Sequence, residues 1–315
     1  MGMWRHRLNI LPAMSVSAAT ASRRLDENAI ATAQRRLAAQ PSPPWLHQEV
    51  ARRMADRLQI IRQQPERILD WWSFLGAGGA LLDAAYPKAQ RIAVEPNEAF
   101  VARSRAANQR PWWSPRLRGS SVSVVDEAQA PGNVQLVWAN MMLHAAKEPP
   151  AVMARWERAL AADGFVMLSC FGPDTLRELR ELYGRLGWPS PMAEFVDMHD
   201  LGDMLLQAGF ADPVMDQETL TLSWPDAPSL LAELRVLGGN ASTARFAGLR
   251  TPRWRGVLER ELQSLAGPDG RLSLRFEIAY GHAFKAAPRI RAGEPTTVSL
   301  DDMRALVRSG RRATK

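Results

Sequence analysis

The chain has 315 residues, of which 46% are apolar and 23% charged, so it can bury a sizeable core and is not globally disordered. No apolar run approaches the ~18 residues of a membrane-spanning helix. The formal net charge of +7 favours acidic partners, but the arginines recur along predicted helices, and no DNA- or RNA-binding motif is present. The single cysteine, Cys170, excludes an internal disulfide and fits a reducing cytoplasm, and the five scattered histidines predict no metal site.

Residues 1–22 are interpreted as a disordered leader, with two arginines, many small residues and no acid before Asp26. The pattern is typical of a transit-type leader and equally of an overlong gene start. Helices are predicted over 26–39 and 45–64, separated by prolines, and the second carries apolar residues about four positions apart. Residues 23–64 are therefore predicted to form a helical N-terminal region.

From residue 65 onward strands and helices alternate. Strands are predicted over 67–72, 91–95, 121–125, 134–139 and 164–170, with helices that open at Gly76, after Asn97 and at the prolines from 149. This alternation predicts an α/β fold with a mostly parallel central sheet and helices on both faces.

After Cys170 the pattern changes. Helices are predicted over 176–186, 200–208, 227–238 and 253–265, and strands over 214–223 and 273–284. We expect these late strands to form an antiparallel C-terminal edge. The main domain is thus predicted to cover 65–300, with helical insertions after the fifth strand, and a basic tail is predicted over 301–315.

The turn between the first strand and its helix carries glycines, which is typical of a nucleotide-like cofactor site. Backbone amides at a helix N-terminus create local positive potential, and missing Cβ atoms let a ligand approach the chain. An acid at the end of the next strand can accept hydrogen bonds from ribose hydroxyls. Glu95, 25 residues after Asp70, holds that place.

At these positions the sequence resembles the class I S-adenosyl-L-methionine-dependent methyltransferases. Their first motif is an acid at the end of strand one, followed by three glycines at alternate positions. Asp70 matches the acid, and the glycine positions fall at Trp72, Phe74 and Gly76, of which only the last is glycine. The resemblance implies a Rossmann-like methyltransferase fold with S-adenosyl-L-methionine as cofactor, bound at these four positions and at Glu95.

The resemblance continues along the next two strands. Asp126 matches the acid that contacts adenine in the family, and Asn140 follows strand four, where the family places polar residues that face the reacting methyl group. Both residues are therefore added to the predicted cofactor site.

Three later stretches, 138–144 (WANMMLH), 171–180 (FGPDTLRELR) and 199–210, resemble the malonyl-[acyl-carrier protein] O-methyltransferases of biotin synthesis. They also resemble the mitochondrial complex I assembly factor that hydroxylates an arginine, and that similarity extends to 45–57 and 295–300. The first family implies an acidic acyl-carrier protein as partner. His144, Phe171 and Asp174 are the candidates for substrate contacts.

Each candidate also has a local structural interpretation. Asp70 can cap backbone amides, Glu95 can start a helix, Asp126 can lie in a solvated turn, and Asp174 can cap the following helix together with Thr175. His144 lies four residues after Asn140 and can share its helical face, or it can be an ordinary packed histidine.

The loop departs from the family at two glycine positions. Trp72 and Phe74 place bulk where the backbone should approach a ligand, and side chains with a Cβ resist positive φ. Three functions therefore stay open: methylation of the malonyl carboxylate, a non-methylating relative such as a hydroxylase or respiratory-complex assembly factor, and a pseudoenzyme with a plugged cofactor site. An ionised carboxylate needs no general base, so no catalytic group is assigned, and an arginine is its natural anchor.

Overall fold

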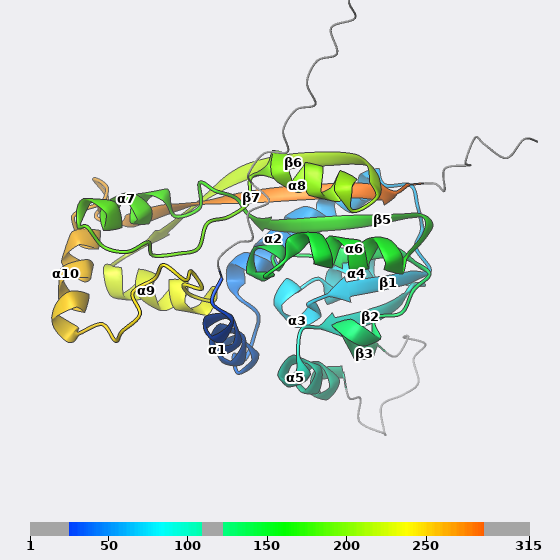
Figure 1. Ribbon diagram of the computed structural model, residues 1–315, viewed down its shortest axis with the longest axis horizontal. Helices are drawn as coiled ribbons and strands as arrows, with labels where there is room; N and C mark the ends of the chain where they lie inside the picture. Colours follow the sequence, from blue (N-terminus) through cyan, green and yellow to red (C-terminus); the bar gives the residue numbers. More distant parts are fainter. Residues whose placement is uncertain (1–24, 109–121, 287–315) are drawn as a thin grey trace, which may run out of the picture.

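The computed structural model describes residues 25–108 and 122–286, and its centre is a seven-stranded sheet with the order β3-β2-β1-β4-β5-β7-β6 (Figure 1). The first five strands are parallel, and β7 is antiparallel to both of its neighbours, so the predicted α/β sheet with an antiparallel edge is confirmed. The strands are β1 (Arg67–Trp71), β2 (Gln90–Glu95), β3 (Ser123–Asp126), β4 (Val134–Ala139), β5 (Leu160–Phe171), β6 (Phe210–Trp224) and β7 (Leu272–Lys285). The predicted leader and basic tail lie outside the described residues.

Ten α-helices accompany the sheet in the described ranges. They are α1 (Glu27–Ala38), α2 (Trp45–Arg57), α3 (Ser73–Gly76), α4 (Gly79–Ala85), α5 (Glu98–Asn108), α6 (Pro149–Ala159), α7 (Arg177–Arg185), α8 (Met198–Gln207), α9 (Ala227–Val236) and α10 (Pro252–Gln263). Short 3-10 helices follow at η2 (Leu58–Ile60), η3 (Glu127–Gln129) and η4 (Leu143–Ala145). None of the helices that the structure describes is long and apolar enough to cross a membrane.

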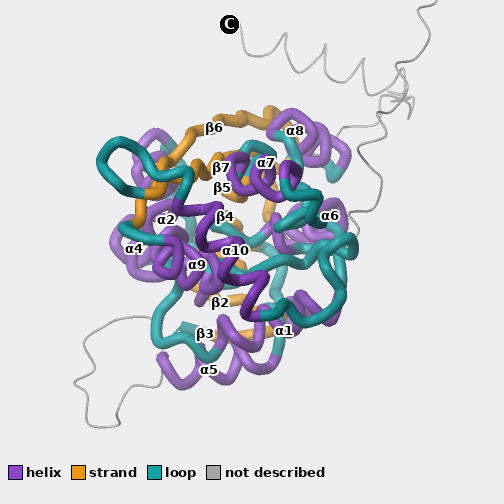
Figure 2. Tube along the Cα trace, turned by 90° about the vertical axis from the view of Figure 1, so that its left-hand side faces the viewer, coloured by secondary structure: helices purple, strands orange, loops and turns teal. Residues whose placement is uncertain are grey.

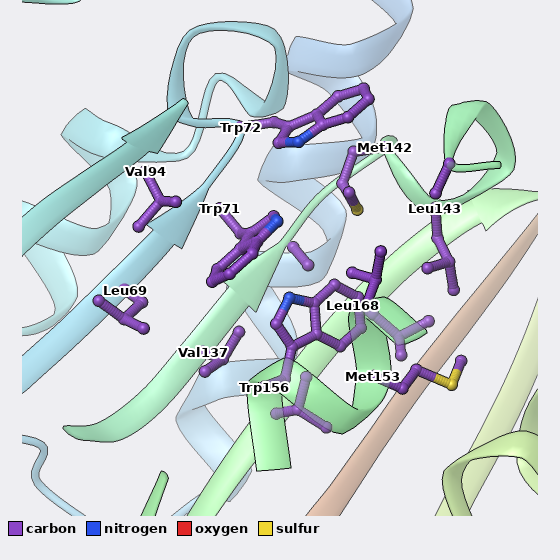
Figure 3. Packing of buried hydrophobic residues seen from close by; sticks show 14 of the residues in the cluster. Leu69, Trp71, Trp72, Val94, Val137, Met142, Leu143, Met153, Trp156 and Leu168 are labelled. Atoms are coloured by element: carbon purple, nitrogen blue, oxygen red, sulfur yellow. The ribbon is translucent and has the colours of Figure 1, made fainter. Parts of the chain in front are cut away.

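The sheet is covered on both faces because successive strand side chains point to opposite sides. On β1, Ile68 packs in one apolar cluster with residues of α2 and α4, whereas Leu69 and Trp71 pack in another with residues of α6 and α8. Figure 3 shows the second cluster, in which the rings of Trp71 and Trp156 meet edge to face with centroids 6.2 Å apart. This packing fixes the end of β1, from which the candidate site begins.

Two predicted helix starts are confirmed by their capping contacts. The Asp26 carboxylate accepts a hydrogen bond from the Ala29 amide before α1, and the Asn97 side chain accepts one from the Phe100 amide before α5. Helices α7, α9 and α10 lie together against the far ends of β6 and β7, at the left of Figure 1. Helix α1 lies between this group and the parallel strands.

Candidate active site

The turn after β1 keeps a glycine-like backbone although its first residue is a tryptophan. Trp72 has φ of 54°, a left-handed conformation that costs a side-chain-bearing residue about 1–2 kcal/mol. One helical turn, α3, follows, and Ala77 is left-handed again with φ of 52°. The prediction of a single helix that starts at Gly76 is therefore wrong, because the left-handed Ala77 separates α3 from α4.

The Trp72 side chain lies across the carboxyl ends of the strands. Its indole Nε1 donates to Glu127 Oε1 at 2.6 Å, and Glu127 Oε2 pairs with Arg155 at 2.7 Å. The side chain is buried and projects past the end of β1 on the side of Met142 (Figure 3). The indole is thus fixed by a charged partner that lies 55 residues away in sequence.

Two pockets meet at Trp72. The outer pocket has a volume of about 400 Å³, and its polar lining residues are Glu27, Gln34, Glu127, Lys147, Glu148 and Arg155. The inner pocket has a volume of about 100 Å³, and the lining residues used below are His47, Leu75, Met141, His144, Phe171 and Phe195. Trp72 lines both pockets together with Ile30, Gln34 and Ala145. Its indole is therefore part of the wall between them.

Asp70 is buried and holds the loop in place. One carboxylate oxygen lies 3.3 Å from an Arg91 guanidinium nitrogen and accepts a hydrogen bond from the Ser73 hydroxyl at 2.6 Å. Burial raises the pKa of Asp70, and the Arg91 charge opposes that rise. Among the described residues both contacts come from side chains and Asp70 Oδ1 has no partner, so the capping of backbone amides is not seen. The contact of Asp70 with a cofactor stays a prediction.

Glu95 is covered by the loop. Its Oε1 accepts hydrogen bonds from the Phe74 amide at 3.0 Å and from the Ser104 hydroxyl at 2.6 Å, and the residue has no exposed surface. Burial raises the pKa of Glu95 to about 8, so the carboxyl is largely protonated at neutral pH. The Phe74 ring packs against Phe100 and lies under the Arg103 guanidinium, which closes the loop over the acid.

Asp126 and its neighbour Glu127 make different contacts. The Asp126 carboxylate accepts from the Gln129 amide at 2.8 Å and caps η3, in agreement with the turn interpretation. Glu127, which the sequence did not single out, reaches the outer pocket and binds Trp72. The adenine contact predicted for Asp126 stays a prediction.

Asn140 joins three parts of the fold. Its fully buried side chain donates to the Gly76 carbonyl at 2.7 Å and to the His47 carbonyl at 2.9 Å, and it accepts from the Ser169 hydroxyl at 2.6 Å. Gly76 thus contributes its carbonyl oxygen as the acceptor for Asn140. Both residues hold the loop against α2 and β5.

Replacing Asn140 with alanine is expected to lower the free energy of unfolding by about 2–4 kcal/mol, because it removes three hydrogen bonds that a fully buried amide makes. Urea unfolding followed by circular dichroism measures the effect. The exposed Asn28, replaced in the same way, is the control and should change stability little. A loss below about 1 kcal/mol for Asn140→Ala would mean that water replaces the amide.

The structure brings two of the three substrate candidates together. The rings of His144 and Phe171 have centroids 4.4 Å apart, and both line the inner pocket beside Phe195. Asp174 is exposed, lines neither pocket, and contacts Glu277 only through its backbone amide, which donates to Oε2 at 2.6 Å. No side chain caps α7, so the capping interpretation of Asp174 is not seen either.

His47 is a site residue that the sequence analysis missed. It is buried, its Nδ1 donates to the Leu75 carbonyl at 2.9 Å, and burial lowers its pKa to about 4, so it is neutral. Its Nε2 is left as a buried acceptor without a hydrogen-bond partner, in a residue that lines the inner pocket. Its position in the sequence could have indicated that His47 is buried, because it lies on the same face of the helix as Ala51 and Met54.

The arrangement as a whole defines a methyltransferase-fold protein with its cleft at the carboxyl ends of β1 to β5. Residues 75–168 match the methyltransferase domain family. The YcgJ protein of Bacillus subtilis superposes with a TM-score of 0.50 at 12% identity, covering 74% of this chain and 98% of that one, so the two share the fold.

Curated relatives give the particular family. The malonyl-[acyl-carrier protein] O-methyltransferase of Gallionella capsiferriformans is 38% identical, with 78% of this chain and 86% of that protein covered. The protein of the same name from Laribacter hongkongensis is 35% identical, with coverages of 83% and 88%. The chain belongs to the malonyl-[acyl-carrier protein] O-methyltransferase family.

The cleft in this conformation does not fit S-adenosyl-L-methionine in the pose that the family resemblance implies. A ligand that ran from the loop to the ends of β2 and β3 would meet the Trp72 indole, and the Glu95 oxygen expected to bind ribose is covered by the Phe74 amide. The orphaned, buried Glu95 Oε2 marks where such a contact could form once the loop moves. No group of metal-binding side chains was found among the described residues.

Proposed function

We propose that this chain is an S-adenosyl-L-methionine-dependent methyltransferase that methylates the free carboxylate of malonyl-acyl-carrier protein. The observation that carries the proposal is 35–38% identity, over most of both chains, to proteins of that name. The inner pocket supports the proposal, because two of the residues that the family resemblance offers for substrate contacts, His144 and Phe171, line it together with His47.

The residues of the inner pocket suit a carboxylate nucleophile. A carboxylate is ionised at neutral pH and needs no base, so the protein has only to orient it and to remove water from it. The walls are mostly aromatic or aliphatic, with Gln34 as a polar exception, and the buried His47 is neutral, so desolvation raises the reactivity of the bound anion. No arginine lines this pocket among the described residues, so the anchor expected from the sequence is not placed there.

The second candidate is a methyltransferase-fold protein without methyl transfer, acting as a respiratory-complex assembly factor, an arginine hydroxylase or a binding protein. The specific observation in its favour is the closed cleft. In it the Trp72 indole donates a hydrogen bond to Glu127, and the Phe74 amide donates one to Glu95. The two functions differ in whether the indole leaves the cleft when a cofactor is offered.

A reconstituted reaction tests the proposal. The full chain, S-adenosyl-L-methionine carrying a labelled methyl group, and malonyl-acyl-carrier protein should give a labelled methyl ester on the carrier. Acetyl-acyl-carrier protein, which lacks the free carboxylate, is the matched control and should stay unlabelled. Micromolar binding of S-adenosylhomocysteine without methylation would reject the acceptor, and no binding at millimolar concentration would favour the second candidate.

A further inference from the structure

The segment from the end of α9 to the first half of α10 is one-sidedly charged. Residues 235–258 contain five arginines and no acid, although the chain as a whole has 33 acids in 315 residues. The inner pocket is lined in part by Leu237, Gly238, Gly239 and Ala241, in the turn after α9. Figure 2 views the molecule from the end that carries α9 and α10 and shows both helices in front of the sheet. The five arginines therefore flank an uncharged turn that lines the pocket.

Three of these arginines have no ion-pair partner within the described ranges. Arg245 pairs with Asp26 at 2.8 Å and Arg255 pairs with Glu259 at 2.7 Å, but Arg235, Arg250 and Arg253 make no such contact. Unpaired cations at a surface create a field that steers an acidic partner and raises its association rate.

Apolar side chains lie exposed among the free arginines. Leu249 is 97% exposed and Phe246 is 44% exposed, whereas most large apolar residues of the described chain are buried. The Arg250 guanidinium lies 3.8 Å from the Phe246 ring centroid and 4.4 Å from that of Trp254. This stacking limits the freedom of Arg250, so less entropy is lost when it binds an anion. Exposed apolar groups beside fixed charge are typical of a protein-binding surface.

We propose that the α9–α10 surface, formed by Arg235, Arg250, Arg253, Phe246 and Leu249, is where the acyl-carrier protein docks. The inference rests on the proposed function, since a carrier protein is the acidic partner that it requires. Charge complementarity selects the partner, and the two apolar side chains supply area that is removed from water. The same segment lines the inner pocket through Leu237, Gly238, Gly239 and Ala241, so a docked carrier can present its acyl arm to His144 and Phe171.

Charge reversal on this surface is the test. The double variant Arg250→Glu, Arg253→Glu is expected to weaken binding of malonyl-acyl-carrier protein at least tenfold in calorimetric titration at low salt, and to reduce the salt dependence of the dissociation constant. Leu249→Ser is expected to weaken it about threefold, and with 97% exposure this residue does not contribute to folding. Arg62→Glu, Arg158→Glu is the matched control, with the same charge change at two exposed arginines elsewhere.

The outcomes distinguish carrier docking at this surface from methyl transfer in the site. Loss of methylation on the carrier substrate with retained methylation of malonyl-pantetheine supports docking at α9–α10. Carrier binding by the wild type that is lost in the double variant supports it even if no methyl group is transferred. Equal binding by the two double variants, stronger binding of nucleic acid than of carrier, or no carrier binding by the wild type would overturn it.

Discussion

Replacing Trp72 with glycine is expected to tighten the binding of S-adenosylhomocysteine by about ten- to a hundredfold. In the wild type, a ligand in the cleft must displace a buried indole and break its hydrogen bond to the charged Glu127, and such a bond contributes about 1.5–3 kcal/mol. Glycine removes the indole's part of the wall between the inner and outer pockets and adopts φ of 54° without strain. Calorimetric titration of both proteins measures the change.

Two further variants separate bulk from hydrogen bonding at this position. Trp72→Phe keeps an aromatic ring in the cleft but cannot donate to Glu127. A small gain in affinity for S-adenosylhomocysteine is therefore expected, because the ligand no longer has to break that hydrogen bond. Glu127→Gln keeps an acceptor for the indole but removes the charge, and the indole is expected to be held less firmly. If Trp72→Gly binds S-adenosylhomocysteine no better than the wild type, the indole is not the obstacle, and closure of the loop over Glu95 becomes the explanation.

Periodicity predicted the order of the elements well because each strand and helix carries its own pattern. Residues 134–139 were predicted as a strand to the residue, and the parallel sheet followed from the alternation of elements. The long strands β6 and β7 extend beyond their predicted ends, since their outer parts are paired with each other along 210–224 and 272–285 rather than buried on both faces. Pairing of this kind leaves a weak hydropathy signal.

The site was less predictable because its contacts join distant segments. The sequence indicated that Trp72 could fill the cleft, but not that Glu127 would bind its indole or that Asn140 would bind the His47 and Gly76 carbonyls. The left-handed Ala77 was also missed, since alanine gives no local signal for positive φ. Such features depend on which buried polar groups meet in three dimensions.

The Glu95→Gln variant is expected to be more stable than the wild type at pH 8 and about equal to it at pH 4.5. The pKa of Glu95 is about 8 in the native protein against 4.5 without burial, so between these values the unfolded chain releases a proton that the native chain keeps. Stability therefore falls as pH rises through this window, by up to about 1.4 kcal/mol per pH unit. Glutamine keeps the acceptor for the Phe74 amide and the Ser104 hydroxyl and has no proton to lose.

Urea unfolding at several pH values between 6.5 and 8 isolates this effect. Below pH 6.5 the buried neutral His47 acts in the opposite direction, because its pKa of about 4 makes stability rise with pH up to the unfolded value of 6.5. Glu98→Gln, an exposed change at the start of α5, controls for surface charge. Equal pH slopes in wild type and Glu95→Gln would mean that Glu95 is ionised in the native protein. An ionised Glu95 would require water or the Arg103 charge to reach Oε2, and the loop would then cover the acid less fully than its contacts with Phe74 and Ser104 indicate.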